Sequence, residues 1–98
     1  MAIVDYDALT QFEAEARKGR VEALYNLGLA YSTGQGVRVD YIAAHKWFNL
    51  AAMQGNPDAA RLRQEIAEQM SNLEIASAQR AARALRPPPL QPRFQFCD

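Results

Sequence analysis

The sequence predicts an all-α fold built from stacked helical hairpins, and two observations lead to this prediction. When the 98-residue chain is compared with itself at an offset of 36 residues, a series of identical residues aligns: Ala8 with Ala44, Phe12 with Phe48, Ala16 with Ala52, Gly19 with Gly55 and Ala23 with Ala59. The residues of this series are four, four, three and four positions apart, which is the spacing of one helix face interrupted at a glycine. A helical pattern that recurs with a period of roughly 20–50 residues is typical of repeats whose hairpins stack side by side.

The first two helices are bounded by charged residues and glycines. The first helix is expected over residues 7–18, after Asp5 or Asp7 as N-cap, and it should end at Lys18-Gly19, where a cation faces the negative end of the helix dipole and glycine can take a positive φ. The second helix is expected over residues 21–33 and is ended by Gly34-Gln35-Gly36. A tight turn at these glycines would complete the hairpin with the third helix.

The third and fourth helices begin at strong capping signals. Asp40 is a favourable N-cap for a helix over residues 41–54, in which Trp47 should be the main apolar anchor. Asn56-Pro57-Asp58 combines an N-cap, a proline at the first helical position and an acid in the first turn, so the fourth helix should run from there to about Met70.

The fifth helix should open at the capping box formed by Ser71 and Glu74 and continue to about Leu85. We expect Leu73, Ala76, Ala81 and Leu85 to be available for its contacts. Beyond Arg86 the prolines of Pro87-Pro88-Pro89-Leu90-Gln91-Pro92 cannot continue a helix and favour an extended chain. The sequence therefore divides into a helical domain, residues 1–86, and a Pro-rich extended tail, residues 87–98.

Composition excludes several classes of function. The 11 Lys and Arg residues balance 11 Asp and Glu residues, so the excess of positive charge that is typical of nucleic-acid binding is absent and no nucleic-acid partner is expected. No apolar run approaches the ~20 residues of a transmembrane helix. The single Cys97 rules out an intramolecular disulfide, and the start of the sequence lacks the pattern of a secretion signal. We therefore expect a cytoplasmic protein. A position on the cytoplasmic side of a membrane-associated assembly is compatible with this expectation.

Residues 16–59 carry a spaced pattern of small and bulky residues that resembles the Sel-1-like repeat, a relative of the tetratricopeptide repeat. The pattern starts at Ala16-x-x-Gly19. The residues that carry the remainder of it are Ala23, Leu27, Gly28, Tyr31, Gly34, Gly36, Val37, Asp40, Ala44, Trp47, Ala51, Ala52, Gly55 and Ala59. The resemblance covers one full repeat and half a repeat on either side.

The resemblance implies a right-handed α-solenoid that serves as an adaptor or scaffold for protein complexes. It also implies that the motif residues are structural and that the repeat holds no catalytic residues and no cofactor. The chain lacks the cysteine pairs that staple the hairpins of secreted members, which agrees with a cytoplasmic location. Because repeats bury their faces only against neighbours, the ends need a cover, which the fifth helix, a partner protein or a second copy of this chain would provide.

Two regions are candidates for partner binding. Tyr25 and Leu29 lie one turn apart on the second helix, roughly opposite Leu27 and Tyr31, so their apolar surface is covered either by the first helix or by a partner whose contact would be rimmed by Glu22 and Asn26. The other region is the tail, where Leu90, Arg93, Phe94 and Phe96 would anchor an extended segment in a groove of the partner.

The remaining chemical candidates are weak. His45, the only histidine, is expected opposite Trp47, on the side of the third helix that faces solvent or a neighbour, as an exposed histidine that forms neither a metal site nor a catalytic site. Cys97 has no companion histidine in a recognisable motif, so a thiol enzyme is only a minor alternative. The acidic residues are interspersed with Arg17, Arg61 and Arg63 at helical spacing and are expected to form solvated faces. A further alternative is a weak binder of an anionic surface, either a membrane or a nucleic acid, through the arginines toward the C-terminus: Arg80, Arg83, Arg86 and Arg93.

Overall fold

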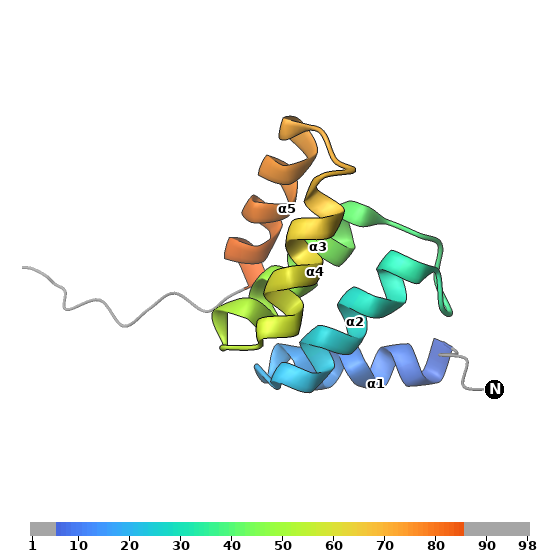
Figure 1. Ribbon diagram of the computed structural model, residues 1–98. Coiled ribbons are helices and arrows are strands. Elements are labelled where there is room, and N and C mark those ends of the chain that lie inside the picture. Colours follow the sequence, from blue (N-terminus) through green and yellow to red (C-terminus); the bar gives the residue numbers. More distant parts are fainter. Residues whose placement is uncertain (1–5, 86–98) are drawn as a thin grey trace, which may run out of the picture.

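The computed structural model describes residues 6–85 and confirms the predicted all-α class (Figure 1). Within these residues the structure has no strand and has five helices: α1, Tyr6–Arg17; α2, Val21–Thr33; α3, Tyr41–Met53; α4, Pro57–Ala67; and α5, Asn72–Leu85. The predicted tail and its candidate residues Leu90, Arg93, Phe94 and Phe96 lie outside the described residues, as does Cys97.

Helices α1 and α2 end as their glycines predict. Gly19 has a φ of 82° and donates its N–H to the carbonyl oxygen of Ala16 at 2.8 Å. Gly34 has a φ of 80° and donates its N–H to the carbonyl oxygen of Ala30, also at 2.8 Å. Residues with a Cβ atom rarely adopt this left-handed backbone conformation, so glycine is the residue that ends these two helices at low conformational cost.

The N-caps of α3, α4 and α5 also follow the predictions. Asp40 accepts a hydrogen bond from the N–H of Ala43 at 3.1 Å, and Asn56 accepts one from the N–H of Ala59 at 2.9 Å. At α5 the capping box is complete: the N–H of Ser71 donates to Glu74 Oε1 at 2.9 Å, and the N–H of Glu74 donates to Ser71 Oγ at 3.1 Å. These bonds satisfy N–H groups that have no partner inside the helix.

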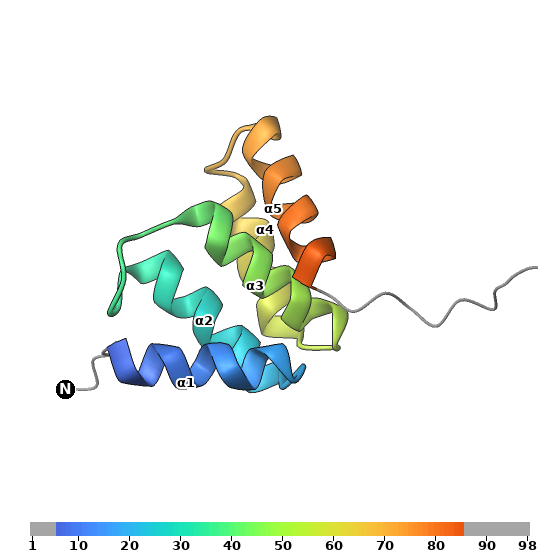
Figure 2. The same ribbon diagram turned by 180° about the vertical axis from the view of Figure 1, so that it is seen from behind.

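Helix α3 is the centre of the packing. It lies between α2 on one side and α4 and α5 on the other, while α1 packs on α2 at the end of the stack (Figures 1 and 2). Phe48 and Leu27 are the largest fully buried side chains, and Ala44, Ala51 and Ala59 have no exposed surface. The hairpins therefore stack as a helical solenoid whose core runs along α3.

The repeat motif residues contribute to this fold in two ways. Ala23, Leu27, Gly28, Ala44, Trp47, Ala51 and Ala59 are buried between helices, and Tyr31, Gly34 and Ala52 are half-buried. Gly36, Asp40 and Gly55 are exposed, so they act through the backbone instead. Gly36 and Gly55 take positive φ values of 78° and 98°, and Asp40 caps α3.

Two details of the C-terminal helices differ from the predictions. Helix α4 ends at Ala67 rather than near Met70, because the chain turns there through the hydrogen bonds of Gln69 N–H to Ile66 and Met70 N–H to Ala67. Leu73 is 82% exposed, whereas the face of α5 that meets the core is centred on Ala78 and Ala82. At 100° per residue, Leu73 lies about 140° around the helix from Ala78, which explains its exposure.

Candidate interaction surfaces

The structure places the predicted α2 residues partly in the core. Tyr25 and Leu29 are half-buried and pack against the core cluster, and the ring of Tyr25 lies 5.9 Å from the ring of Phe48 on α3 at an interplanar angle of 53°. Glu22 is exposed in the first turn of α2, and Asn26 is half-buried one turn later. Much of the apolar surface of Tyr25 and Leu29 is therefore covered by the fold itself, and Glu22 and Asn26 carry the polar character of this face.

Glu22 and Asn26 line a cleft of about 210 Å³ where α1 meets α2. Phe12 and Ala23 supply its apolar wall, and the exposed ion pair between Arg20 and Glu15 borders it. This cleft brings two of the predicted contact residues together with an ordered charge pair, and it is the part of the predicted α2 surface that is open to another molecule.

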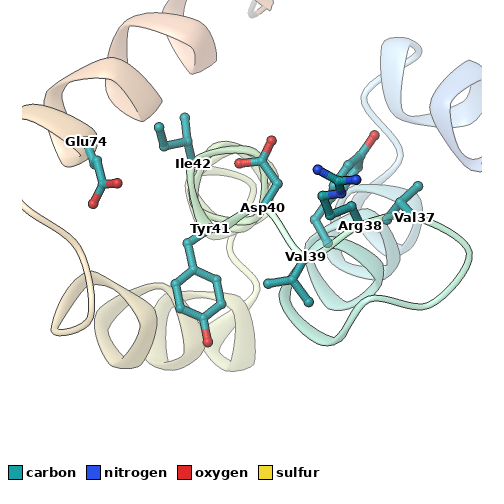
Figure 3. Close-up of a pocket in the computed structure, with 8 residues that line it drawn as sticks. Val37, Arg38, Val39, Asp40, Tyr41, Ile42 and Glu74 are labelled. Atoms are coloured by element: carbon teal, nitrogen blue, oxygen red, sulfur yellow. The ribbon is translucent and has the colours of Figure 1, made fainter.

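A second, wider hollow follows the loop from α2 to α3 and was not predicted (Figure 3). It measures about 530 Å³, and Val37, Val39, Tyr41 and Ile42 line it together with Glu74 of α5. Val39 and Tyr41 are 49% and 37% exposed, which is high for apolar side chains. The alternation of apolar residues at positions 37, 39 and 41 was the sequence signal that could have pointed to it.

His45 contradicts the prediction of an exposed histidine, because only 3% of its surface is accessible. The prediction assumed that α3 has a free face opposite Trp47, but that face is covered by α4 and α5. His45 lines a cleft of about 360 Å³ between these helices, together with Asn49, Arg63, Gln64, Ala67, Ile75 and Gln79. We call this the α3–α4–α5 cleft.

The α3–α4–α5 cleft has a positive and hydrogen-bonding character. Arg63, which was predicted to lie on a solvated face among acids, is half-buried and donates a hydrogen bond from Nη1 to Asn49 Oδ1 at 2.8 Å. Burial lowers the pKa of the His45 imidazole, and the nearby Arg63 guanidinium lowers that pKa further. His45 Nδ1 is buried and has no hydrogen-bond partner among the described residues.

Lys46 on α3, Glu13 on α1 and Tyr31 on α2 form another polar cluster. Lys46 Nζ sits 4.2 Å from the centre of the Trp47 ring, a cation–π contact. Burial lowers the pKa of Lys46, while the carboxylates of Glu13 and Asp40 oppose that effect. Burial and the same two carboxylates raise the pKa of Tyr31. This arrangement holds a half-buried ammonium group beside the core, and Glu13 itself is half-buried rather than fully exposed.

Other surfaces agree with the solvated faces predicted for the acids. Arg61 on α4 pairs with Asp58 at 3.5 Å and with Glu65 at 3.3 Å, and all three side chains are exposed. In the part of the chain that the structure describes, no three His, Cys, Asp or Glu residues are grouped so that they could hold a metal ion. None of the described helices is long and apolar enough to cross a membrane.

Comparison with known proteins identifies the hairpin of α2 and α3. The sequence pattern of the Sel1 repeat family matches residues 21–56, which span both helices, the loop between them and the N-cap of α4. This segment is a Sel1 repeat. The predicted family resemblance is thereby confirmed for the central part of the chain, and α4 and α5 extend the stack on one side of the repeat while α1 extends it on the other.

One relative extends the match beyond this hairpin. The alginate biosynthesis protein AlgK of Azotobacter vinelandii is 41% identical to this chain over 59 residues. The match covers 60% of this chain and 13% of AlgK, so the chain spans only a small part of that relative. The likeness therefore concerns 60% of this chain and not AlgK as a whole.

Proposed function

We propose that this chain is a noncatalytic protein-binding module, an adaptor or an accessory subunit of a larger protein complex. The observation that carries the proposal is the Sel1 repeat at residues 21–56, since Sel1 repeats are generally modules for protein–protein interaction. No cofactor is part of the proposed function.

The way the repeat is packed supports this proposal. Leu27, Ala44 and Ala51 are completely buried, so these motif side chains are used to join the helices. The residues left for binding lie between the motif positions. Glu22 and Asn26 are two of them: they are polar, unlike the apolar packing residues, and they line an open cleft. A scaffold of fixed hairpins with polar residues on an open cleft suits the recognition of another protein.

We assign two regions to the contact. The first is the α2 face with Glu22, Tyr25, Asn26 and Leu29, where Tyr25 and Leu29 form the apolar base and the other two residues the polar rim. The second is the tail, with Leu90, Arg93, Phe94 and Phe96. The partner is a different protein or a second copy of this chain.

The test uses the tagged full-length chain at its natural expression level. Native pull-down with mass spectrometry identifies the partner, and the dissociation constant is then measured with purified components. Glu22→Arg combined with Asn26→Ala should weaken binding at least about tenfold if the α2 face is central to the contact. Glu68→Arg, an equal charge reversal at the exposed end of α4, is the matched control and should leave the affinity unchanged.

Deletion of residues 87–98 tests the tail in the same assay. Loss of binding on deletion would place the contact in the tail, and unchanged binding would remove the tail from the proposal. If neither the α2 variant nor the deletion changes the affinity for any captured protein, or if the chain is a stable monomer that retains no partner, the proposed function is wrong.

A location in the cytoplasm belongs to the same proposal. Its support is that the sequence holds one cysteine, Cys97, and so cannot form the intramolecular disulfides that stabilise many small secreted domains. Fractionation of the cells that express the protein checks this location, and recovery of the chain outside the cytoplasm would contradict it.

A further inference from the structure

The α3–α4–α5 cleft combines residues from three helices that are distant in sequence. His45 and Asn49 lie one turn apart on α3, Arg63 and Ala67 one turn apart on α4, and Ile75 and Gln79 one turn apart on α5. His45 is buried, whereas Gln64 and Gln79 are exposed. The cleft therefore has a buried floor at α3 and a polar mouth at α4 and α5.

Arg63 gives this cleft a positive charge that none of the described residues neutralises with an ion pair. Among residues 6–85, its one polar contact is the hydrogen bond to Asn49, and none of the ion pairs involves it. The neighbouring Arg61 on the same helix has two carboxylate partners. A half-buried guanidinium without a counter-charge favours an anion, and its planar fork of N–H groups matches a carboxylate.

His45 adds to the same cleft a polar group that has no partner among the described residues. Its Nδ1 is buried without a partner, although buried polar atoms are nearly always hydrogen-bonded. A carboxylate in the cleft would accept a hydrogen bond from the protonated Nδ1 and at the same time lie near Arg63. Asn49 is already engaged with Arg63, so it holds the guanidinium in place on the floor of the cleft.

The size and walls of the cleft favour a side chain over a bare ion. Its volume of about 360 Å³ is within the range of small-ligand pockets, and Ala67 and Ile75 supply apolar wall. We infer that the α3–α4–α5 cleft binds a carboxylate group, namely the Asp or Glu side chain of the protein partner. This assignment rests on the proposed function for the source of the carboxylate, while the carboxylate site itself can be tested without the partner.

His45 makes the site directly observable, because it is the only histidine of the chain and its imidazole signals in NMR are unambiguous. The full chain is titrated with sodium acetate against sodium chloride at equal ionic strength, and the His45 ring signals and their pH titration are followed. We expect a saturable shift with acetate at millimolar concentrations and a rise of about one pH unit in the titration midpoint of His45, since an opposite charge nearby favours the imidazolium ion. Because the coupling is reciprocal, acetate should bind more tightly as the pH is lowered through that midpoint.

Variants on α4 separate the site from general charge effects. Arg63→Gln should weaken acetate binding at least about tenfold, whereas Arg61→Gln, two residues away and exposed, should leave it unchanged. If acetate shifts His45 no more than chloride does, or if both variants behave alike, the cleft holds solvent only and the inference is wrong. Stronger binding of inorganic phosphate than of acetate would likewise overturn the assignment to a carboxylate.

A second variant guards against loss of the fold in Arg63→Gln. Gln79→Glu places a carboxylate at the exposed mouth of the cleft with almost no change of shape. It should compete with acetate, weaken its binding and raise the titration midpoint of His45 in the absence of added ligand. An unchanged midpoint together with unchanged acetate affinity would contradict the inference.

The source of the carboxylate is tested with two capped tripeptides, Gly-Glu-Gly and Gly-Gln-Gly. Binding of the Glu peptide at least as tightly as acetate, with no shift from the Gln peptide, supports an acidic side chain. Acetate binding without Glu-peptide binding overturns that source and leaves a site for a small free carboxylate. Since these measurements contain no partner protein, their failure is distinct from failure of the proposed protein-binding function.

Discussion

Gly28 is the position where the close approach of α2 and α3 can be tested with one methyl group. A Cβ atom built on Gly28 would lie 2.5 Å from Cε1 and 2.8 Å from Cγ of Phe48, and it would also collide with Cδ1 of that ring. Real Cβ atoms essentially never approach another heavy atom within 3.0 Å. Phe48 is 1% exposed and its ring is also in contact with Tyr25, so the ring has little room to move away.

The expected cost of Gly28→Ala is the difference of two opposing effects. Forcing an extra methyl into a packed core costs about 1–3 kcal/mol, and the clash with a buried ring that has little room to move places Gly28→Ala at the upper end of that range, about 2–3 kcal/mol. Replacing a mid-helix glycine by alanine returns up to about 1 kcal/mol, because alanine has the higher helix propensity. The free energy of unfolding should therefore fall by about 1–2 kcal/mol, which corresponds to a decrease in Tm of roughly 4–16 °C for a domain of this size.

Urea unfolding followed by far-UV circular dichroism and by the fluorescence of Trp47, the single tryptophan, measures this change. Phe48→Leu supplies the control, since the smaller side chain makes room for the methyl. In the Phe48→Leu background, adding Gly28→Ala should cost nothing or stabilise the protein by up to about 1 kcal/mol. A Gly28→Ala variant as stable as the parent, or an equal loss in both backgrounds, would refute the close contact of α2 with Phe48.

Three further changes are predicted. Asn56→Ala removes the bond to the Ala59 N–H and should lower the free energy of unfolding in urea by about 1 kcal/mol, while Asn56→Asp, which keeps a capping oxygen, should restore most of it. The pKa of His45 is lowered in the folded protein, so below the ordinary value of 6.5 the unfolded chain binds a proton that the folded chain does not. The free energy of unfolding should therefore fall as the pH drops through 6.5 and level off below the lowered pKa of the folded state. His45→Gln should abolish this part of the pH dependence. Leu73→Ser, at a side chain that is 82% exposed, should change stability by less than about 0.5 kcal/mol in the same urea assay, and a larger loss would mean that Leu73 is covered in solution.

The helix boundaries could be predicted because the signals that set them are local. Each cap satisfies a backbone N–H group only three residues away, so neighbouring residues in the sequence are enough to identify it. This holds for Asp40, Asn56 and the capping box at Ser71. The C-terminal end of α4 lacked such a signal. Residues 68–70 contain neither glycine nor proline, and the helix ends there in a turn that only the structure shows.

The repeat pattern also predicted which helices join, since its small residues mark the close contacts. It did not predict the face of α5, because that helix has alanines on several sides. Ala76, Ala78, Ala81 and Ala82 are similar candidates by sequence, and the structure buries Ala78 and Ala82 most deeply. Selecting among alanines requires the orientation of α5 on α3, which is a property of the assembled stack.

The α3–α4–α5 cleft lay beyond sequence reasoning for a related reason. His45 is not a motif position, and Arg63 lies after the matched repeat, so the family pattern assigns a role to neither. On a single helix His45 is simply the residue opposite Trp47, which would be solvated if α3 had one packed face. Because α3 is covered on both sides, a residue that the sequence pattern places on the outside becomes the floor of a cleft. Its pKa is lowered first by this burial and then by Arg63 from the next helix. In this stack the middle turns of α3 are covered on both sides, so the polar residues opposite its motif positions are the ones to inspect for binding.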